Sequence, residues 1–268
     1  MDPLIEAGVA LVTGAGSGIG QAIAVGFAKS GCKRLFLADI NVGALEETQA
    51  LIQKDTPEAK ITLYKANVSE KQSVQDMIAK CVDVYGRLDF ACNNAGVGAT
   101  NTKTADLSVE AFDRVNSINA QGVFLCQKYE IKQMLQQTPL IFSDHRAQRG
   151  SIINTASMNG IAVLGTLPGY NASKHAVVSM TRVDARHFAP EGIRINCICP
   201  GFVETPMLTG SGLEDKFIEA TKAQSPSNRL MKPTEVANGV VFLAGSLASG
   251  INGIHLPIDG GGLLFHVV

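Results

Sequence analysis

Short apolar runs alternate with segments of helical periodicity along nearly the whole 268-residue chain. Such runs are typical of strands buried on both faces, and their alternation with helices predicts a parallel sheet covered on both sides. The expected strands are residues 9–14, 34–40, 60–68, 88–96, 150–157, 193–199 and 254–259. Joined by right-handed crossovers, they predict an α/β fold with one doubly wound sheet of seven parallel strands. No linker interrupts the pattern, so we expect a single domain over residues 1–268.

The segments between these runs have the spacing of amphipathic helices. Helices are expected after the first strand, over 42–54, from a capping box formed by Ser69 and Gln72, over 108–137, around residues 170–174, over 213–223 and over 233–247. A polar insertion at 138–149 is expected to be a surface excursion.

Composition and charge narrow the classes of function. Hydrophobic residues make up 46% of the chain and the formal net charge is −1. No block of like charge is present, so we expect a small-molecule partner and neither nucleic acid nor membrane. None of the six cysteines forms a C-x-x-C pair, which predicts reduced core residues and no metal site. The first residues lack a basic leader region and no apolar run reaches about 18 residues, so a cytoplasmic location is expected.

A glycine-rich turn, TGAGSGIG (13–20), follows the first expected strand. It is not a literal G-x-G-x-x-G, but its glycines allow a tight turn and the next helix offers free N–H groups to a pyrophosphate. Asp39 ends the second strand about 20 residues on, where a carboxylate accepts hydrogen bonds from an adenosine ribose. Ser17 and Ile40 stand where a cation for a 2′-phosphate is expected, so NAD is favoured over NADP. A solvated acid at a strand end is the alternative for Asp39.

Tyr170 and Lys174 stand four positions apart in a segment of helical character. Residues at this spacing touch on one face of a helix. The Lys174 ammonium is therefore expected to favour the phenolate of Tyr170, whose ordinary pKa is about 10. Such a pair could move protons near neutral pH. The same spacing also arises by chance in solvated surface pairs, so the pair alone does not decide.

Further motifs, in their order, resemble those of the short-chain dehydrogenase/reductase family. TGAGSGIG matches its T-G-x-x-x-G-x-G, NNAG (93–96) its N-N-A-G and YNASK (170–174) its Y-x-x-x-K. Ser157 lies 13 residues before Tyr170, the family's spacing for its catalytic serine, and Asn119 matches its catalytic asparagine. PGFVET (200–205) and IDGG (258–261) match two further landmarks. The resemblance covers nearly the whole chain, implies a Rossmann-like fold and extends to microbial and fungal members of secondary metabolism.

The resemblance implies four catalytic residues, Asn119, Ser157, Tyr170 and Lys174. Tyr170 would be the general acid/base that exchanges a proton with the substrate oxygen while hydride moves to or from a nicotinamide. Lys174 would hold the nicotinamide ribose and lower the pKa of Tyr170, and Ser157 would hydrogen-bond the substrate oxygen. Asn119 would anchor a water in a proton relay, with helix capping or core hydrogen bonding as its alternative interpretation.

Cofactor contacts carry over from the family by position. The implied residues are Gly14, Ser17, Gly18, Ile19, Gly20, Asp39, Ile40, Asn67, Val68, Asn94, Ala95, Gly96, Tyr170, Lys174, Pro200, Gly201, Val203 and Thr205. Asn67 departs from the aspartate that the family more often has, and its side-chain oxygen is expected to accept a hydrogen bond from the adenine amino group.

Uncharged residues flank the implied catalytic groups. The expected substrate residues are Val97, Met158, Ile161, Leu164, Phe202, Met207 and Leu208, with Met231 nearby. Ordinary core packing is the alternative for each of them. As a substrate set they predict an apolar secondary alcohol or ketone, and the resemblance to fungal members extends this to a polycyclic or terpenoid-like one, with sugars and sterols as alternatives. Segment 206–230 is consistent with a lid that closes on substrate.

The apolar tail GGLLFHVV (261–268) and the long central helices, which build tetramers in this family, imply a homotetramer. Three functions remain open. The leading one is an NAD-dependent oxidoreductase acting on CH–OH groups. The second is an isomerase, dehydratase or cyclase of natural-product biosynthesis that uses the same fold. The third is a non-catalytic dinucleotide-binding regulator, which the presence of all four catalytic residues disfavours.

Overall fold

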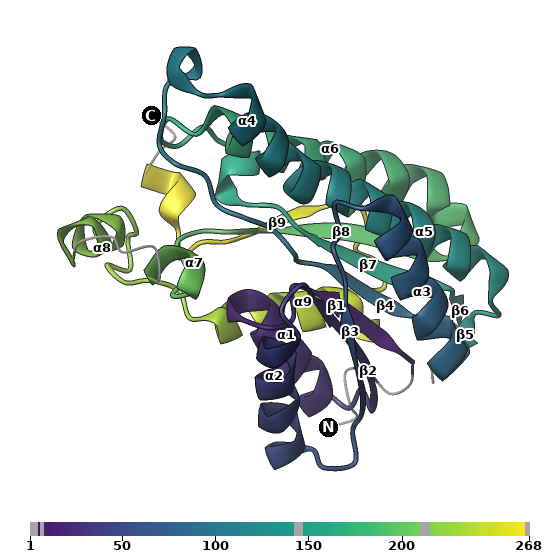
Figure 1. The fold of residues 1–268 in the computed structure, drawn as a ribbon. Coiled ribbons are helices and arrows are strands. Elements are labelled where there is room, and N and C mark those ends of the chain that lie inside the picture. Colours follow the sequence, from purple (N-terminus) through teal and green to yellow (C-terminus); the bar gives the residue numbers. More distant parts are fainter. Residues whose placement is uncertain (1–4, 6–7, 142–146, 210–214, 266–268) are drawn as a thin grey trace.

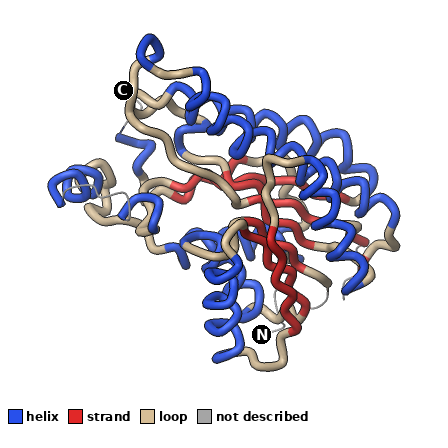
Figure 2. Tube along the Cα trace, viewed as in Figure 1, coloured by secondary structure: helices blue, strands red, loops and turns tan. Residues whose placement is uncertain are grey.

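A parallel sheet of seven strands forms the centre of the computed structural model, which describes residues 5, 8–141, 147–209 and 215–265 (Figures 1 and 2). The strand order is β3-β2-β1-β4-β7-β8-β9, so the chain changes direction across the sheet between β1 and β4. The strands are β1 (Ala10–Thr13), β2 (Arg34–Asp39), β3 (Lys60–Lys65), β4 (Phe90–Asn93), β7 (Gly150–Thr155), β8 (Ile193–Pro200) and β9 (His255–Ile258). The predicted doubly wound α/β fold is confirmed.

Helices cover both faces of this sheet (Figure 1). The first layer contains α1 (Gly18–Lys29), α2 (Val42–Asp55) and α9 (Pro233–Ala244). The second contains α3 (Lys71–Tyr85), α4 (Val109–Asn116), α5 (Gly122–Gln136) and α6 (Pro168–Phe188). The short α7 (Pro206–Thr209) and α8 (Asp215–Lys222) lie beyond the carboxyl edge of the sheet. Each layer packs apolar side chains against one face of the sheet, so the covered strands carry apolar residues on both faces.

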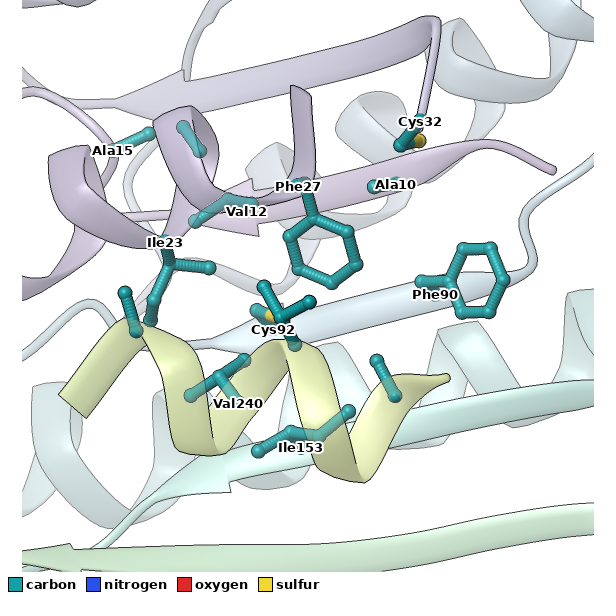
Figure 3. Close-up of a cluster of buried hydrophobic side chains, with 14 of the residues drawn as sticks. Ala10, Val12, Ala15, Ile23, Phe27, Cys32, Phe90, Cys92, Ile153 and Val240 are labelled. Atoms are coloured by element: carbon teal, nitrogen blue, oxygen red, sulfur yellow. The ribbon is translucent and has the colours of Figure 1, made fainter. Parts of the chain in front are cut away.

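The core between the first layer and the sheet is close-packed (Figure 3). The rings of Phe27 on α1 and Phe90 on β4 lie with centroids 6.0 Å apart, and neither side chain is exposed. Val240 of α9 belongs to the same cluster. Burial of such side chains stabilises the fold by about 2 kcal/mol each and holds the carboxyl edge of the sheet in a fixed shape.

Two local predictions differ from the structure. The capping box of Ser69 and Gln72 is wrong, because α3 begins at Lys71 and Ser69 instead donates from its hydroxyl to Asn67 Oδ1 at 2.7 Å. The helix expected over 108–137 is interrupted by a π-helical turn over residues 117–121. Single π-helical turns of this kind often mark functional sites, and this one contains Asn119.

The insertion at 138–149 contains two short antiparallel strands, β5 (Leu140–Ile141) and β6 (Ala147–Gln148), which pair outside the main sheet. Ile141 is 66% exposed, as expected of a surface excursion. Gln148 is buried and accepts a hydrogen bond from Arg194 of β8 at 2.9 Å. This hydrogen bond attaches the C-terminal end of the insertion to β8. Residues 142–146 lie outside the described part.

A buried carboxyl group lies on the second layer's side of the sheet. Glu130 of α5 has no exposed surface, and its Oε2 accepts from Asn93 Nδ2 at 2.9 Å. The same nitrogen donates to Asn154 Oδ1 at 3.0 Å. Among the described residues, Glu130 Oε1 and Asn93 Oδ1 are buried with no hydrogen-bond partner. Burial raises the pKa of Glu130 to about 8, opposed by the hydrogen bond from Asn93.

All six cysteines are buried free thiols, as predicted. In the described part of the chain, no cluster of three or more metal-ligating side chains occurs. Nor is any helix there long and apolar enough to cross a membrane.

Candidate active site

A cavity of about 570 Å³ opens at the carboxyl edge of the sheet. Residues that follow β1, β2, β4, β7 and β8 line it, so it spans the point where the strand order reverses. Open α/β sheets bind ligands at this point because the loops diverge there. Its volume is in the range typical of sites for cofactors and small molecules.

The glycine turn forms one wall of the cavity. Gly14 and Gly18 adopt positive φ angles of 66° and 54°, which favour glycine over other residues. A side chain at Gly20 would collide with the Gly14 carbonyl. Ser17, at the N-cap of α1, makes no side-chain hydrogen bond to the helix, so the first N–H groups remain available to an anion. The turn therefore fits a pyrophosphate.

Asp39 lies at the end of β2 against this turn. Its Oδ2 accepts from the Gly16 N–H at 2.9 Å and its Oδ1 from the Asn41 N–H at 2.9 Å. These two hydrogen bonds fix the carboxylate beside the cavity, where Ile40 also lies, 63% exposed. A carboxylate in this place can accept from vicinal ribose hydroxyls, and it repels a phosphate.

Asn67 lines the same end of the cavity, but its side chain is engaged in its own turn. Its Oδ1 accepts from the Ser69 N–H and hydroxyl at 3.1 and 2.7 Å, and its Nδ2 donates to Glu70 at 2.7 Å. The expected hydrogen bond from an adenine amino group would compete with these bonds. A short polar side chain that bonds to the backbone two residues on is typical of a turn.

Ser157, Tyr170 and Lys174 line the other part of the cavity. Ser157 follows β7, and its Oγ accepts from the Asn159 N–H at 3.2 Å. The Lys174 ammonium donates to the Thr155 carbonyl at 2.9 Å and lies 5.7 Å from the centroid of the Tyr170 ring. The spacing of four residues on α6 thus places the lysine and the tyrosine on one helical face, as predicted.

Burial controls the pKa values of these groups. It raises the pKa of Tyr170, although a hydrogen bond with Ser157 acts in the opposite direction. It lowers the pKa of Lys174 to about 8. The expected lowering of the Tyr170 pKa by Lys174 is not found in this structure, where burial raises the pKa and only the bond with Ser157 opposes it. A bound positive ring beside the phenol would shift the balance toward the phenolate.

Asn119 is fully buried in the π-helical turn. Its Oδ1 accepts from the Val97 N–H at 2.8 Å and its Nδ2 donates to the Val97 carbonyl at 2.9 Å. These bonds hold the loop that follows β4, where a methyl group added at Gly96 would lie 3.1 Å from Asn119 Oδ1 and 3.7 Å from the Lys174 nitrogen. The side-chain hydrogen bonds of Asn119 are those of a core residue, which is the alternative interpretation given above. Asn119 nevertheless lies beside Lys174, where the proton relay is expected.

Most of the expected substrate residues line the cavity, namely Val97, Met158, Phe202, Met207 and Leu208. Ile161 and Leu164 do not, and Met231 is buried in a bridge to Val203. All of the implied cofactor residues except Gly20 line it as well, and Gly20 packs directly under the turn. The lid expected over 206–230 includes residues 210–214, which lie outside the described part.

The sequence analysis missed several lining residues, of which three bear on the chemistry of the cavity. Arg114 and Ile118 approach from the helical segment before Asn119, and Asn159 follows Ser157 by two residues. Arg114 and Ile118 stand four residues apart, and this spacing could have predicted that both lie on one face of the helix. In the described lining, the charged side chains are Asp39, Arg114 and Lys174.

Comparison with known proteins identifies the family. A family model described as enoyl-(acyl carrier protein) reductase matches residues 14–262. Levodione reductase of Leifsonia aquatica is 36% identical over 94% of this chain and 93% of its own length. The chain belongs to the short-chain dehydrogenase/reductase family. Cyclohexanol dehydrogenase of an Acinetobacter species is 35% identical over 94% of this chain and 93% of its own length. A short-chain dehydrogenase of Penicillium roqueforti is 32% identical over 95% of each chain.

Solved structures of the family agree in fold. A crystal structure of levodione reductase superposes with a TM-score of 0.89 at 36% identity, covering 97% of this chain and 98% of the other. A 3-ketoacyl-(acyl-carrier-protein) reductase from Brucella melitensis, complexed with NADH, superposes with a TM-score of 0.83 at 31% identity, covering 96% of this chain and 98% of the other. Short-chain dehydrogenases/reductases use nicotinamide dinucleotides, and levodione reductase and cyclohexanol dehydrogenase are named as oxidoreductases of a ketone and of an alcohol.

Proposed function

We propose that this short-chain dehydrogenase/reductase is an NAD-dependent enzyme that interconverts a secondary alcohol and a ketone on a largely apolar ring. One observation carries the proposal: a single cavity is lined at one end by the glycine turn and Asp39 and at the other by Ser157, Tyr170 and Lys174. Relatives that carry the names of a levodione reductase and a cyclohexanol dehydrogenase support a ring substrate. Polycyclic and terpenoid-like alcohols belong to the same proposal.

The residues at the catalytic end can perform the proton chemistry of this reaction. When bound, a nicotinamide supplies the site that accepts or donates hydride. Ser157 Oγ accepts from the Asn159 N–H and its hydroxyl also hydrogen-bonds Tyr170, so a bound substrate oxygen would take over the hydrogen that Ser157 shares with Tyr170. Tyr170 takes the proton of the alcohol during oxidation and returns it to the ketone oxygen during reduction. Lys174, which uses one proton on the Thr155 carbonyl, can donate its others to a ribose hydroxyl.

NAD is favoured over NADP by the charge at the adenosine end. The Asp39 carboxylate is held there by the N–H groups of Gly16 and Asn41. The neighbouring residues Ser17 and Ile40 bring no positive charge, and Arg114 reaches the cavity from a different element, α4. Fluorescence titration of the purified protein with NADH and NADPH tests this assignment, and tighter binding of NADPH would contradict it.

Replacement of Asp39 by alanine together with Ile40→Arg should move the cofactor preference toward NADP. The change removes a repulsive charge and adds a donor for a 2′-phosphate, so we expect the ratio of the Kd values for NADPH and NADH to fall by about a hundredfold. Ile40→Arg alone is the matched control, because it keeps the carboxylate, and its effect should be smaller. An unchanged ratio in the double variant would show that Asp39 does not face the ribose.

We also propose that the chain forms a homotetramer. Phe124 on α5 and Val183 on α6 are 46% and 50% exposed, and Phe242 on α9 is 38% exposed. Apolar side chains of this size on two separate faces are typical of surfaces that pack against other copies. Light scattering coupled to size-exclusion chromatography should give the mass of four chains, and a monomer at micromolar concentration would refute the assignment.

A further inference from the structure

A polar side chain with no part in the proposed proton chemistry lines the substrate end of the cavity. Asn159 lies in a 3₁₀ turn over Met158–Gly160, two residues after Ser157. It is only 6% exposed. Apart from the catalytic groups, residues at this end include the apolar Met158, Phe202 and Leu208.

Hydrogen bonds fix the orientation of the Asn159 amide. Its Nδ2 donates to the Leu164 carbonyl at 3.2 Å and to Asn171 Oδ1 at 2.7 Å. A backbone carbonyl can only accept, so the nitrogen must face Leu164, and a flipped amide would set two oxygens against each other. The amide oxygen of Asn159 is therefore turned away from this pair of acceptors.

That oxygen is open to a ligand. Within the described residues Asn159 Oδ1 accepts no hydrogen bond, and the polar side-chain atoms sealed from solvent without a partner are Asn93 Oδ1 and Glu130 Oε1. Asn159 Oδ1 is therefore not sealed, and Asn159 is one of the residues that line the cavity. A ligand that excluded water from this oxygen without replacing the hydrogen bond would be penalised by about 1–3 kcal/mol.

We propose that Asn159 Oδ1 accepts a hydrogen bond from a second hydroxyl group of the substrate, which is therefore a cyclic diol or hydroxyketone. This inference rests on the proposed alcohol oxidation. The backbone N–H of Asn159 donates to Ser157 Oγ at 3.2 Å, so the residue that carries Oδ1 adjoins the residue that would bind the reacting oxygen. We therefore place the second hydroxyl on the ring that carries the reacting carbon.

The charges around the cavity favour a hydroxyl over other donors. An ammonium group would need a carboxylate close by, and Asp39, the acidic residue of the described lining, lies at the adenosine end. Burial of an ammonium without such a partner is strongly unfavourable. A substrate carboxylate would place its oxygens against the oxygen of Asn159. A neutral hydroxyl donates a hydrogen bond to the amide oxygen and buries no charge in the cavity.

The test compares oxidation of cyclohexanol with that of three cyclohexanediols, in which the hydroxyls are adjacent, one carbon apart or opposite on the ring. In the wild-type protein with NAD, kcat/KM for at least one diol should exceed that for cyclohexanol by about tenfold. Asn159→Leu removes the acceptor at similar volume and should bring this ratio close to one. If Asn159→Leu does not bind NADH, Asn159→Ala repeats the measurement.

Asn171→Ala is the matched control. It loosens the same contact between the 3₁₀ turn and α6 but keeps the Leu164 carbonyl, which still accepts from Asn159 Nδ2 and so still orients the amide. It should therefore change both substrates alike and keep their ratio. A wild-type protein that oxidises cyclohexanol as well as every diol would overturn the inference while leaving the alcohol oxidation intact. A preference for a diol that survives Asn159→Leu would also overturn it. Oxidation of none of the four alcohols would refute the proposed function and the inference with it.

Discussion

Replacing Tyr170 with phenylalanine should lower kcat for alcohol oxidation by about a thousandfold and leave the Kd for NADH nearly unchanged. The variant keeps the ring that packs beside Lys174 but loses the hydroxyl that hydrogen-bonds Ser157. A positioned general acid/base contributes roughly 10²–10⁴-fold to a rate. Steady-state kinetics with NAD and a ring alcohol, together with an NADH titration of the same preparation, measure both quantities.

Tyr129→Phe on α5 is the matched control, because Tyr129 lies outside the cavity. It should leave kcat and the Kd for NADH at wild-type values. If Tyr170→Phe kept more than about a tenth of the wild-type kcat, the phenol would not be the group that exchanges the proton.

The free energy of unfolding should fall as the pH rises from about 4.5 to about 8, because Glu130 is buried. The ordinary pKa of a glutamate is 4.5 and that of Glu130 in the fold is about 8. In this window the folded protein keeps a proton that the unfolded chain has released, so rising pH favours unfolding. Each unit of difference corresponds to about 1.4 kcal/mol, and the whole window to about 5 kcal/mol. Denaturant unfolding at a series of pH values measures the slope.

Glu130→Gln should remove this slope and raise stability at pH 8. Its amide is neutral at every pH and adds a donor where Asn93 Oδ1 has no partner. Glu46→Gln on the exposed face of α2 is the matched control and should keep the wild-type slope. The thiols of Cys81, Cys92 and Cys126 around Glu130 have raised pKa values, chiefly from burial, and remain neutral across this window. An equal slope in wild type and Glu130→Gln would assign the titration to another group.

The layers of the fold follow from patterns that lie within single stretches of sequence. The central residues of β2, 35–38, are apolar because helices cover both faces of the sheet, so the position of this strand can be predicted from its composition alone. The spacing of Tyr170 and Lys174 likewise specifies one helical face. The π-helical turn at Asn119 was not predictable, because over five residues its periodicity differs too little from that of an α-helix.

Contacts between distant segments were also beyond reach. The bond between Glu130 and Asn93 joins residues 37 positions apart, and Asn159 meets Asn171 across a loop. The periodicity of a sequence indicates only which residues of one helix or strand share a face, so it cannot predict such pairs. For Asn67 the structure adds a local turn, in which Ser69 and Glu70 hydrogen-bond the side-chain amide that the family resemblance assigns to adenine.

Transfer of deuterium from a labelled alcohol to NAD tests the central claim most directly. Cyclohexanol and a cyclohexanediol, deuterated at the carbinol carbon, are incubated with the purified protein and NAD, and the products are analysed by mass spectrometry. Direct hydride transfer at the site of Ser157, Tyr170 and Lys174 predicts deuterated NADH and the corresponding ketone in equal amounts. Tight binding of NAD without label in the NADH pool, or an isomerised or dehydrated product that retains the label, would contradict the assignment as an alcohol dehydrogenase.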